Sequence, residues 1–159
     1  MEFPGRPRRI QGYDYGAAGP IFHCRIGVAG RAPVFGEPRA ATLVVDALKH
    51  YQAETVHVFA YCVMPDHVHV LVALREANRP LPRWIGDLKR WVVRETAGES
   101  LRVSWQRGFF ERVLRSDEDV ATAAKYIVAN PVRAGLATRV GEYPWAGSFE
   151  WGALESWWG

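Results

Sequence analysis

Two histidines separated by a single residue, His67 and His69, are the first side chains in this sequence whose types and spacing suggest chemistry. Residues i and i+2 of a β-strand point to the same face, so a strand from His67 to Leu74 (HVHVLVAL) would place both imidazoles side by side. Two such imidazoles can bind one divalent metal ion, or they can be ordinary core or surface histidines. Asp66 adjoins them, but alternation sends it to the other face and makes it a poorer ligand candidate.

A second set of polar side chains lies along one expected helix. Ser116 is a suitable N-cap, and three acidic residues follow it in the first turn, where they favour the helix dipole. Tyr126 is offset from the apolar face of this helix, on a stripe with Thr122 and Asn130 at i−4 and i+4. We expect Pro131 to bias Asn130 out of the helical region. The stripe is an exposed packing surface or, paired with the histidines, part of a site.

Basic and aromatic residues are concentrated in the segment 79–115. A basic groove with aromatic platforms suits single-stranded nucleic acid, although Trp84 and Trp91 are expected in the core. The arginines of this segment that could contact DNA are Arg83, Arg90, Arg107 and Arg112. The N-terminal residues 1–19 predict an irregular basic arm, and its candidate phosphate contacts are Arg6, Arg8 and Arg9.

The composition predicts one globular domain. The chain has 159 residues, of which 48% are hydrophobic and 23% charged, and its net charge of +3 is too small to identify a partner. We expect a core over residues 20–149, with the arm before it and a tail over 150–159. Cys24 and Cys62 lie far apart in apolar stretches, which indicates free thiols in the cytoplasm. No segment has the length and apolarity of a transmembrane helix or a signal peptide.

The hydrophobic patterns predict strands and helices in the order that these groups require. The expected strands are Ile21 to Ala29, Thr55 to Met64, His67 to Leu74 and Phe109 to Leu114; the expected helices are Ala40 to Tyr51, Leu81 to Thr96 and the helix capped by Ser116. The first six elements match a ferredoxin-like βαββαβ layout, an antiparallel sheet with helices on one face. The fold class is therefore α+β, with an added helix that carries Tyr126.

Three segments give the sequence a family resemblance. AYCVMPDHVHVLV (Ala60 to Val72), WQRGFFERVLR (Trp105 to Arg115) and KYIVANPVRAGLA (Lys125 to Ala137) resemble, in this order, the IS200-like single-tyrosine transposases and especially their REP-associated branch. The run YPWAGS from Tyr143 to Ser148 is similar to the end of that family's core. The resemblance covers roughly residues 10 to 149.

This resemblance implies a metal-dependent nuclease and strand transferase that acts on single-stranded hairpin DNA. It assigns the nucleophile to Tyr126 and the ligands of Mg²⁺ or Mn²⁺ to His67, His69 and Asn130. Attack by tyrosine would give a 5′-phosphotyrosine and a free 3′-hydroxyl, and a link of this kind can be reversed by another strand. The resemblance favours a monomer, although a dimer is an alternative.

Two further histidines, His23 and His57, lie outside the candidate metal-binding set. His23 and His57 are interpreted as structural, although His23 would approach the site if the strands pair as in the ferredoxin layout.

Two alternative functions are also compatible with parts of the sequence. One alternative is a domesticated module of the same fold that binds hairpin DNA or RNA with little catalysis. The other is a nucleotide hydrolase of the histidine-triad type, which is improbable because Leu71 stands where that pattern has its nucleophilic histidine.

Overall fold

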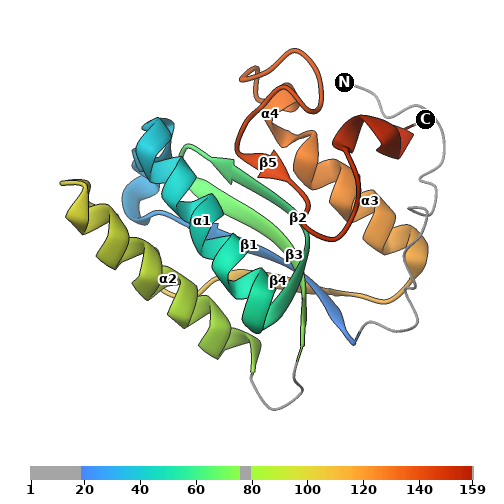
Figure 1. The fold of residues 1–159 in the computed structure, drawn as a ribbon, viewed down its shortest axis with the longest axis horizontal. Helices are drawn as coiled ribbons and strands as arrows, with labels where there is room; N and C mark the ends of the chain where they lie inside the picture. Colours follow the sequence, from blue (N-terminus) through green and yellow to red (C-terminus); the bar gives the residue numbers. More distant parts are fainter. Residues whose placement is uncertain (1–18, 76–79, 159) are drawn as a thin grey trace.

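The computed structural model describes residues 19–75 and 80–158, which form a five-stranded sheet between two layers of helices (Figure 1). The strands are β1 (Ile21–Gly27), β2 (Val56–Met64), β3 (His67–Leu74), β4 (Phe110–Leu114) and β5 (Ala146–Gly147). Their order is β4-β1-β3-β2-β5, and every neighbouring pair is antiparallel. The two-residue turn Pro65–Asp66 joins β2 to β3, as the sequence predicts for a hairpin.

One face of the sheet packs against α1 (Pro38–Glu54) and α2 (Leu81–Gly98), which run side by side in Figure 1. The short helices η1 (Ala29–Arg31) and η2 (Val34–Gly36) lead into α1. From β3, the side chains that enter this core are Val68, Val70 and Val72. Because side chains alternate along a strand, the histidines of β3 must point to the opposite face.

The opposite face packs against α3 (Asp117–Val128), which is followed by α4 (Asn130–Arg133). The Ser116 hydroxyl caps α3 by accepting a hydrogen bond from the backbone N–H of Asp119 at 3.1 Å. Leu71 and Ala73 of β3 enter this second core. The segment that ends in η3 (Leu154–Trp158) also packs here, and Figure 1 shows it beside α3.

The predicted elements agree with the structure to within a few residues, with one exception at Asn130. This residue is the first residue of α4 rather than a non-helical one, so the expected effect of Pro131 is wrong. A proline is accommodated in the first turn of a helix because its missing N–H would have no partner there. The break between the two helices falls instead at Ala129, with φ −87° and ψ −6°.

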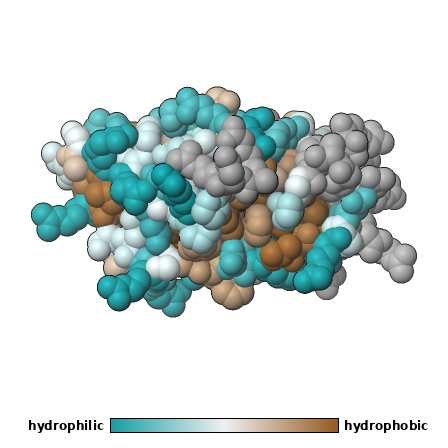
Figure 2. Space-filling view, turned by 90° about the horizontal axis from the view of Figure 1, so that it is seen from below, coloured by the Kyte–Doolittle hydropathy of each residue, from teal (hydrophilic) through white to brown (hydrophobic). Residues whose placement is uncertain are grey.

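The state of the two cysteines agrees with the expectation from the sequence. Cys24 and Cys62 are both free and buried. No helix among the described residues has the length and hydrophobicity needed to cross a membrane. On the face shown in Figure 2, hydrophobic side chains are interspersed with hydrophilic ones.

Candidate active site

The histidine pair of β3 lies on the face of the sheet that α3 covers. The rings of His67 and His69 have their centroids 4.8 Å apart, and His69 is only 7% exposed. Nδ1 of His67 lies 2.6 Å from Oδ1 of Asp66. The other carboxylate oxygen of Asp66, Oδ2, accepts a hydrogen bond from Nε of Arg31 at 3.4 Å. Asp66 belongs to the turn before β3, so strand alternation does not govern its direction. Its carboxylate fixes the orientation of the His67 ring.

His23 joins the pair from the neighbouring strand β1. Its Nε2 lies 3.0 Å from Nδ1 of His69, a hydrogen-bond distance. The sequence analysis favours a structural role for His23, but the pairing of β1 with β3 brings it to the site. His57 lies elsewhere: its Nδ1 contacts Glu150, and it pairs with Ala73 near the far end of β3.

Burial favours the neutral form of all three histidines of this cluster. Burial lowers the pKa of His23, His67 and His69, and it is the largest cause in each case. The pKa of His69 falls to about 3, because its burial is reinforced by positive charge from the neighbouring histidines and from Arg25 and Arg133. Neutral imidazole is the form that binds metal ions.

The donor atoms of the pair fit a divalent metal ion. Nδ1 of each ring is already engaged, that of His67 by Asp66 and that of His69 by His23, so Nε2 of each ring remains for an external partner. Within residues 19–75 and 80–158, no three side chains of His, Cys, Asp and Glu are grouped to hold a metal. Water, a phosphate oxygen of a ligand or an amide such as that of Asn130 would have to complete the coordination of a metal held by the pair. Asn130 is half-buried at the start of α4.

Tyr126 lies on α3 and is 45% exposed. The guanidinium carbon of Arg133 lies 3.7 Å from the centre of its ring, and Nη2 of Arg133 donates to the Tyr126 carbonyl at 2.7 Å. Nη1 of Arg133 is buried and has no hydrogen-bond partner among the described residues. Arg133 thus contacts both the ring and the backbone carbonyl of Tyr126 and keeps one donor unused.

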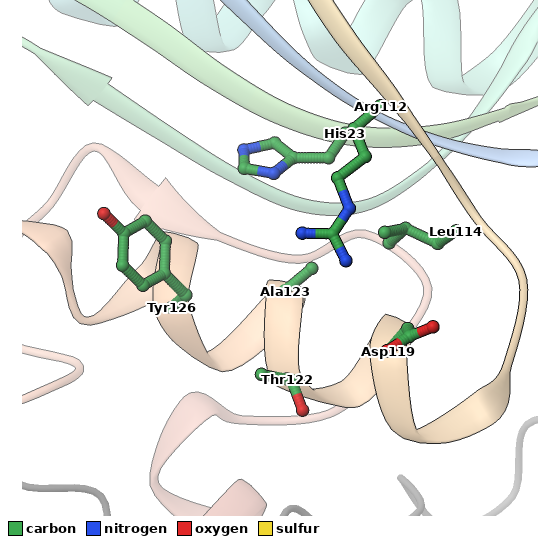
Figure 3. A pocket seen from close by; sticks show the side chains of 7 residues that line it. All are labelled: His23, Arg112, Leu114, Asp119, Thr122, Ala123 and Tyr126. Atoms are coloured by element: carbon green, nitrogen blue, oxygen red, sulfur yellow. The ribbon is translucent and has the colours of Figure 1, made fainter.

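A cavity of about 230 Å³ between the sheet and α3 is lined by both Tyr126 and His23 (Figure 3). His23 and Arg112 reach into it from β1 and β4, and Tyr126 borders it from the helix. The other lining residues are Leu114, Asp119, Thr122 and Ala123. His23 lines this cavity and also contacts His69, so it adjoins both the candidate nucleophile and one candidate metal ligand.

The arginines named from the sequence are distributed over different parts of the molecule. Arg112 lines the cavity, and Arg107 is exposed in the segment before β4. Arg83 and Arg90 lie on α2, which covers the face of the sheet opposite to the histidines, and Arg90 pairs with Asp87 at 2.6 Å. Arg6, Arg8 and Arg9 lie outside the described residues.

The sequence analysis did not select Arg25 or Arg133, the two cations whose charge acts on His69. Arg25 follows His23 at i+2 in a strand and therefore shares its face, which is a signal that the sequence does contain. Arg133 follows Tyr126 by two helical turns, but Pro131 argues against a continuous helix between them. Leu71, which replaces the nucleophile of the histidine-triad pattern, is fully buried in the apolar core.

Comparisons with known proteins identify the family of this chain. The chain matches the family model described as "Transposase IS200 like" over residues 21–130. A Haemophilus influenzae protein named as a REP-associated tyrosine transposase is 33% identical over 109 residues, which cover 62% of this chain and 60% of that protein. The REP-associated tyrosine transposase of Escherichia coli K12 is 30% identical over 87 residues, 55% of this chain and 51% of the relative. The matches thus span about half to three fifths of these curated relatives.

A solved structure shows the same fold. It is described as a REP-associated tyrosine transposase bound to a REP hairpin, and it superposes with a TM-score of 0.66 at 23% identity over 86% of this chain and 81% of the other. The region of this chain that matches the family model includes β1, the hairpin of β2 and β3, and all of α3. His67, His69 and Tyr126 lie within it. This chain belongs to the IS200-like transposase family.

Proposed function

We propose that this chain is a metal-dependent endonuclease and strand transferase that acts on single-stranded hairpin DNA and forms a covalent link through Tyr126. The observation that supports it most directly is the cavity that Tyr126 shares with His23, the hydrogen-bond partner of His69. The fold proposed for this activity is ferredoxin-like, with α3 as the added helix that presents the tyrosine. The strand order β4-β1-β3-β2 and the placement of α1 and α2 on one face support that description.

His67, His69 and Asn130 would hold the metal, with Mg²⁺ or Mn²⁺ as the ion. When bound, the ion polarises the scissile phosphate and offsets the negative charge that develops on it. Asp66 and His23 orient the two imidazoles by their contacts with Nδ1. Arg25 and Arg133 add two positive charges next to the pair, which favour a phosphodiester over a neutral ligand.

The residues of the chain account for the covalent step. The Tyr126 oxygen forms a bond to phosphorus while the bond from phosphorus to the 3′-oxygen breaks, which leaves a 5′-phosphotyrosine and a 3′-hydroxyl. The phenol loses one proton and the departing oxygen gains one, so the step is balanced. The Arg133 guanidinium stacks on the ring of Tyr126, and this contact restricts the rotation of the side chain before attack. One chain supplies all of these groups, in keeping with a monomer.

A covalent-capture assay tests the proposal. The protein is mixed with labelled hairpin DNA from the host genome's own repeats, with Mn²⁺ or with EDTA, and separated on a denaturing gel. We expect a labelled adduct that requires the metal and is absent for Tyr126→Phe, which loses only the hydroxyl. Tyr143→Phe is the matched control, because the Tyr143 hydroxyl donates to the backbone carbonyl of Val63 at 2.7 Å.

Three outcomes of this assay would contradict the proposal in different ways. An adduct that persists in Tyr126→Phe would remove the assignment of the nucleophile. Cleavage by His67→Ala at the wild-type rate, with unchanged metal content, would remove the assignment of the metal site. Tight hairpin binding without any adduct would favour the alternative of a binding module with no catalysis.

A further inference from the structure

A row of side chains crosses the sheet from the histidine pair to its open edge. His69 on β3 is directly opposite Arg25 on β1, and Arg25 is directly opposite Phe110 on β4. Directly opposed residues in antiparallel strands project from the same face, so all three lie on the side of α3. Strands are spaced by ~4.8 Å, which puts Phe110 roughly 10 Å from His69 across the sheet.

Phe110 stands out by its exposure. At 66%, it is the most exposed large hydrophobic side chain among the described residues, and it enters neither of the two cores. It lies on β4, which is an edge strand of the sheet formed by residues 19–75 and 80–158. An aromatic ring that is open on a flat sheet surface is the platform on which proteins stack the bases of single-stranded nucleic acids.

The side chains around Phe110 on this face favour an anionic ligand. Arg25 is next to it in the row, and Arg112 follows it at i+2 and lines the cavity that contains Tyr126. The acidic residue of β4, Glu111, is directly opposite Cys24, whose side chain belongs to the core under α1 and α2. Its carboxylate therefore projects from the other face. A metal site, a cation and an aromatic ring then follow one another along the row.

We propose that Phe110 and Arg25 form the subsite for the nucleotide adjacent to the scissile phosphate. Its base stacks on Phe110, and its phosphate group contacts Arg25, while the scissile phosphate lies at His67 and His69. This inference rests on the proposed function and adds to it the direction in which the single strand leaves the site, over β1 and β4. Stacking accepts every base, so the subsite contributes affinity and alignment rather than sequence choice.

A binding experiment on the full chain separates this subsite from the catalytic step. Tyr126→Phe is used as the background to prevent covalent chemistry, and fluorescence anisotropy measures the Kd of labelled oligo(dT) and of the hairpin DNA with single-stranded flanks. We expect Phe110→Ala to weaken both by about tenfold. Phe110→Trp should retain binding, because it keeps the platform. Val113→Ala is the matched control: Val113 is 45% exposed on the same strand but projects from the other face.

Two further measurements test the assignment at the level of the nucleotide. Single abasic sites placed along the flank should identify one position whose loss weakens binding to the background protein but not to the Phe110→Ala variant. Arg25→Gln should lower the salt slope, d log K/d log[salt], by about 0.7 in magnitude, the value for one phosphate contact on a single strand.

The results distinguish this inference from the proposed function. If Phe110→Ala binds both probes like Val113→Ala, or if its abasic profile equals that of the background, the subsite is refuted, whether or not the Tyr126 adduct forms. If the adduct never forms in the otherwise wild-type protein but the Phe110 effects appear, the subsite stands and the catalytic proposal fails. If the Tyr126→Phe background protein binds neither oligo(dT) nor the hairpin DNA, the subsite and the proposed function are both overturned.

Discussion

The contact between His23 and His69 predicts that a residue outside the metal-binding set controls the affinity for the metal. Nε2 of His23 lies 3.0 Å from Nδ1 of His69, which is 7% exposed and so has little access to water as a substitute partner. Without His23, the His69 ring is free to rotate and its Nδ1 is left buried and unpaired. We expect His23→Leu to weaken Mn²⁺ binding.

The size of this effect follows from the kind of contact that is lost. Removing a residue that orients a ligating histidine typically costs 10- to 100-fold in metal affinity, about 1.4 to 2.7 kcal/mol. Isothermal titration with Mn²⁺, in the Tyr126→Phe background and without DNA, measures this affinity independently of activity. His23→Gln should recover much of it, because its amide oxygen can accept from Nδ1 of His69.

The matched control is His57→Leu. Like His23, His57 is a histidine of the sheet with a side-chain partner, but its partner is Glu150, away from the site. This variant should bind Mn²⁺ like the parent protein. If His23→Leu leaves the Kd unchanged while circular dichroism shows a native fold, the hydrogen bond has no role in metal binding. If His57→Leu weakens binding equally, the effect is a general loss of stability.

Two further predictions concern stability. The pKa of His69 is about 3 in the folded chain and 6.5 as the reference value, so between these pH values only the unfolded chain gains the proton. The metal-free protein should therefore lose stability as the pH falls from 6.5 towards 3, by up to ~1.4 kcal/mol per pH unit, with no contribution from this group above 6.5. Urea unfolding in EDTA across this range checks it, and a His69→Gln profile as steep as the parent's would contradict it. Trp151 is 8% exposed, and its ring centre lies 5.2 Å from that of Phe59. Trp151→Ala should lower the free energy of unfolding by about 3 to 5 kcal/mol. Thermal unfolding against the exposed control Leu136→Ala, expected within ~0.5 kcal/mol of the parent, measures this, and a loss below about 1 kcal/mol would refute it.

Much of the fold could be predicted because its elements have strong local signals. Runs of β-branched and aromatic residues mark β2 and β3, and the apolar stripes of α1 and α2 follow helical spacing. The two-residue strand β5 is too short for any periodic pattern, so it could not be predicted. The helical conformation of Asn130 was missed because the rule for residues before proline competes with the preference of proline for a first helical turn.

The site was predictable only where its residues are close in the sequence. His67 and His69 share a face by alternation alone, and Tyr126 is selected as a candidate by its offset on the helix and by the family resemblance. The contact of His23 with His69 depends on which strands pair, across 46 residues of sequence. The stacking of Arg133 on Tyr126 depends on the bend at Ala129, which no periodicity indicates.

Under the proposed function, the aromatic segment after β5 bears on the order of events during strand exchange. Trp151 and Trp157 are buried between β2 and α3, and Trp158 faces Lys125 of α3 at 5.8 Å, so this segment fastens the helix that carries Tyr126 to its own sheet. This segment would have to separate from α3 before the helix could reach a second molecule. Cutting one strand and sealing the next would therefore take place consecutively at a single centre. The DNA end that is covalently bound to Tyr126 would then remain on the same protein molecule until the next 3′-hydroxyl reacts with it.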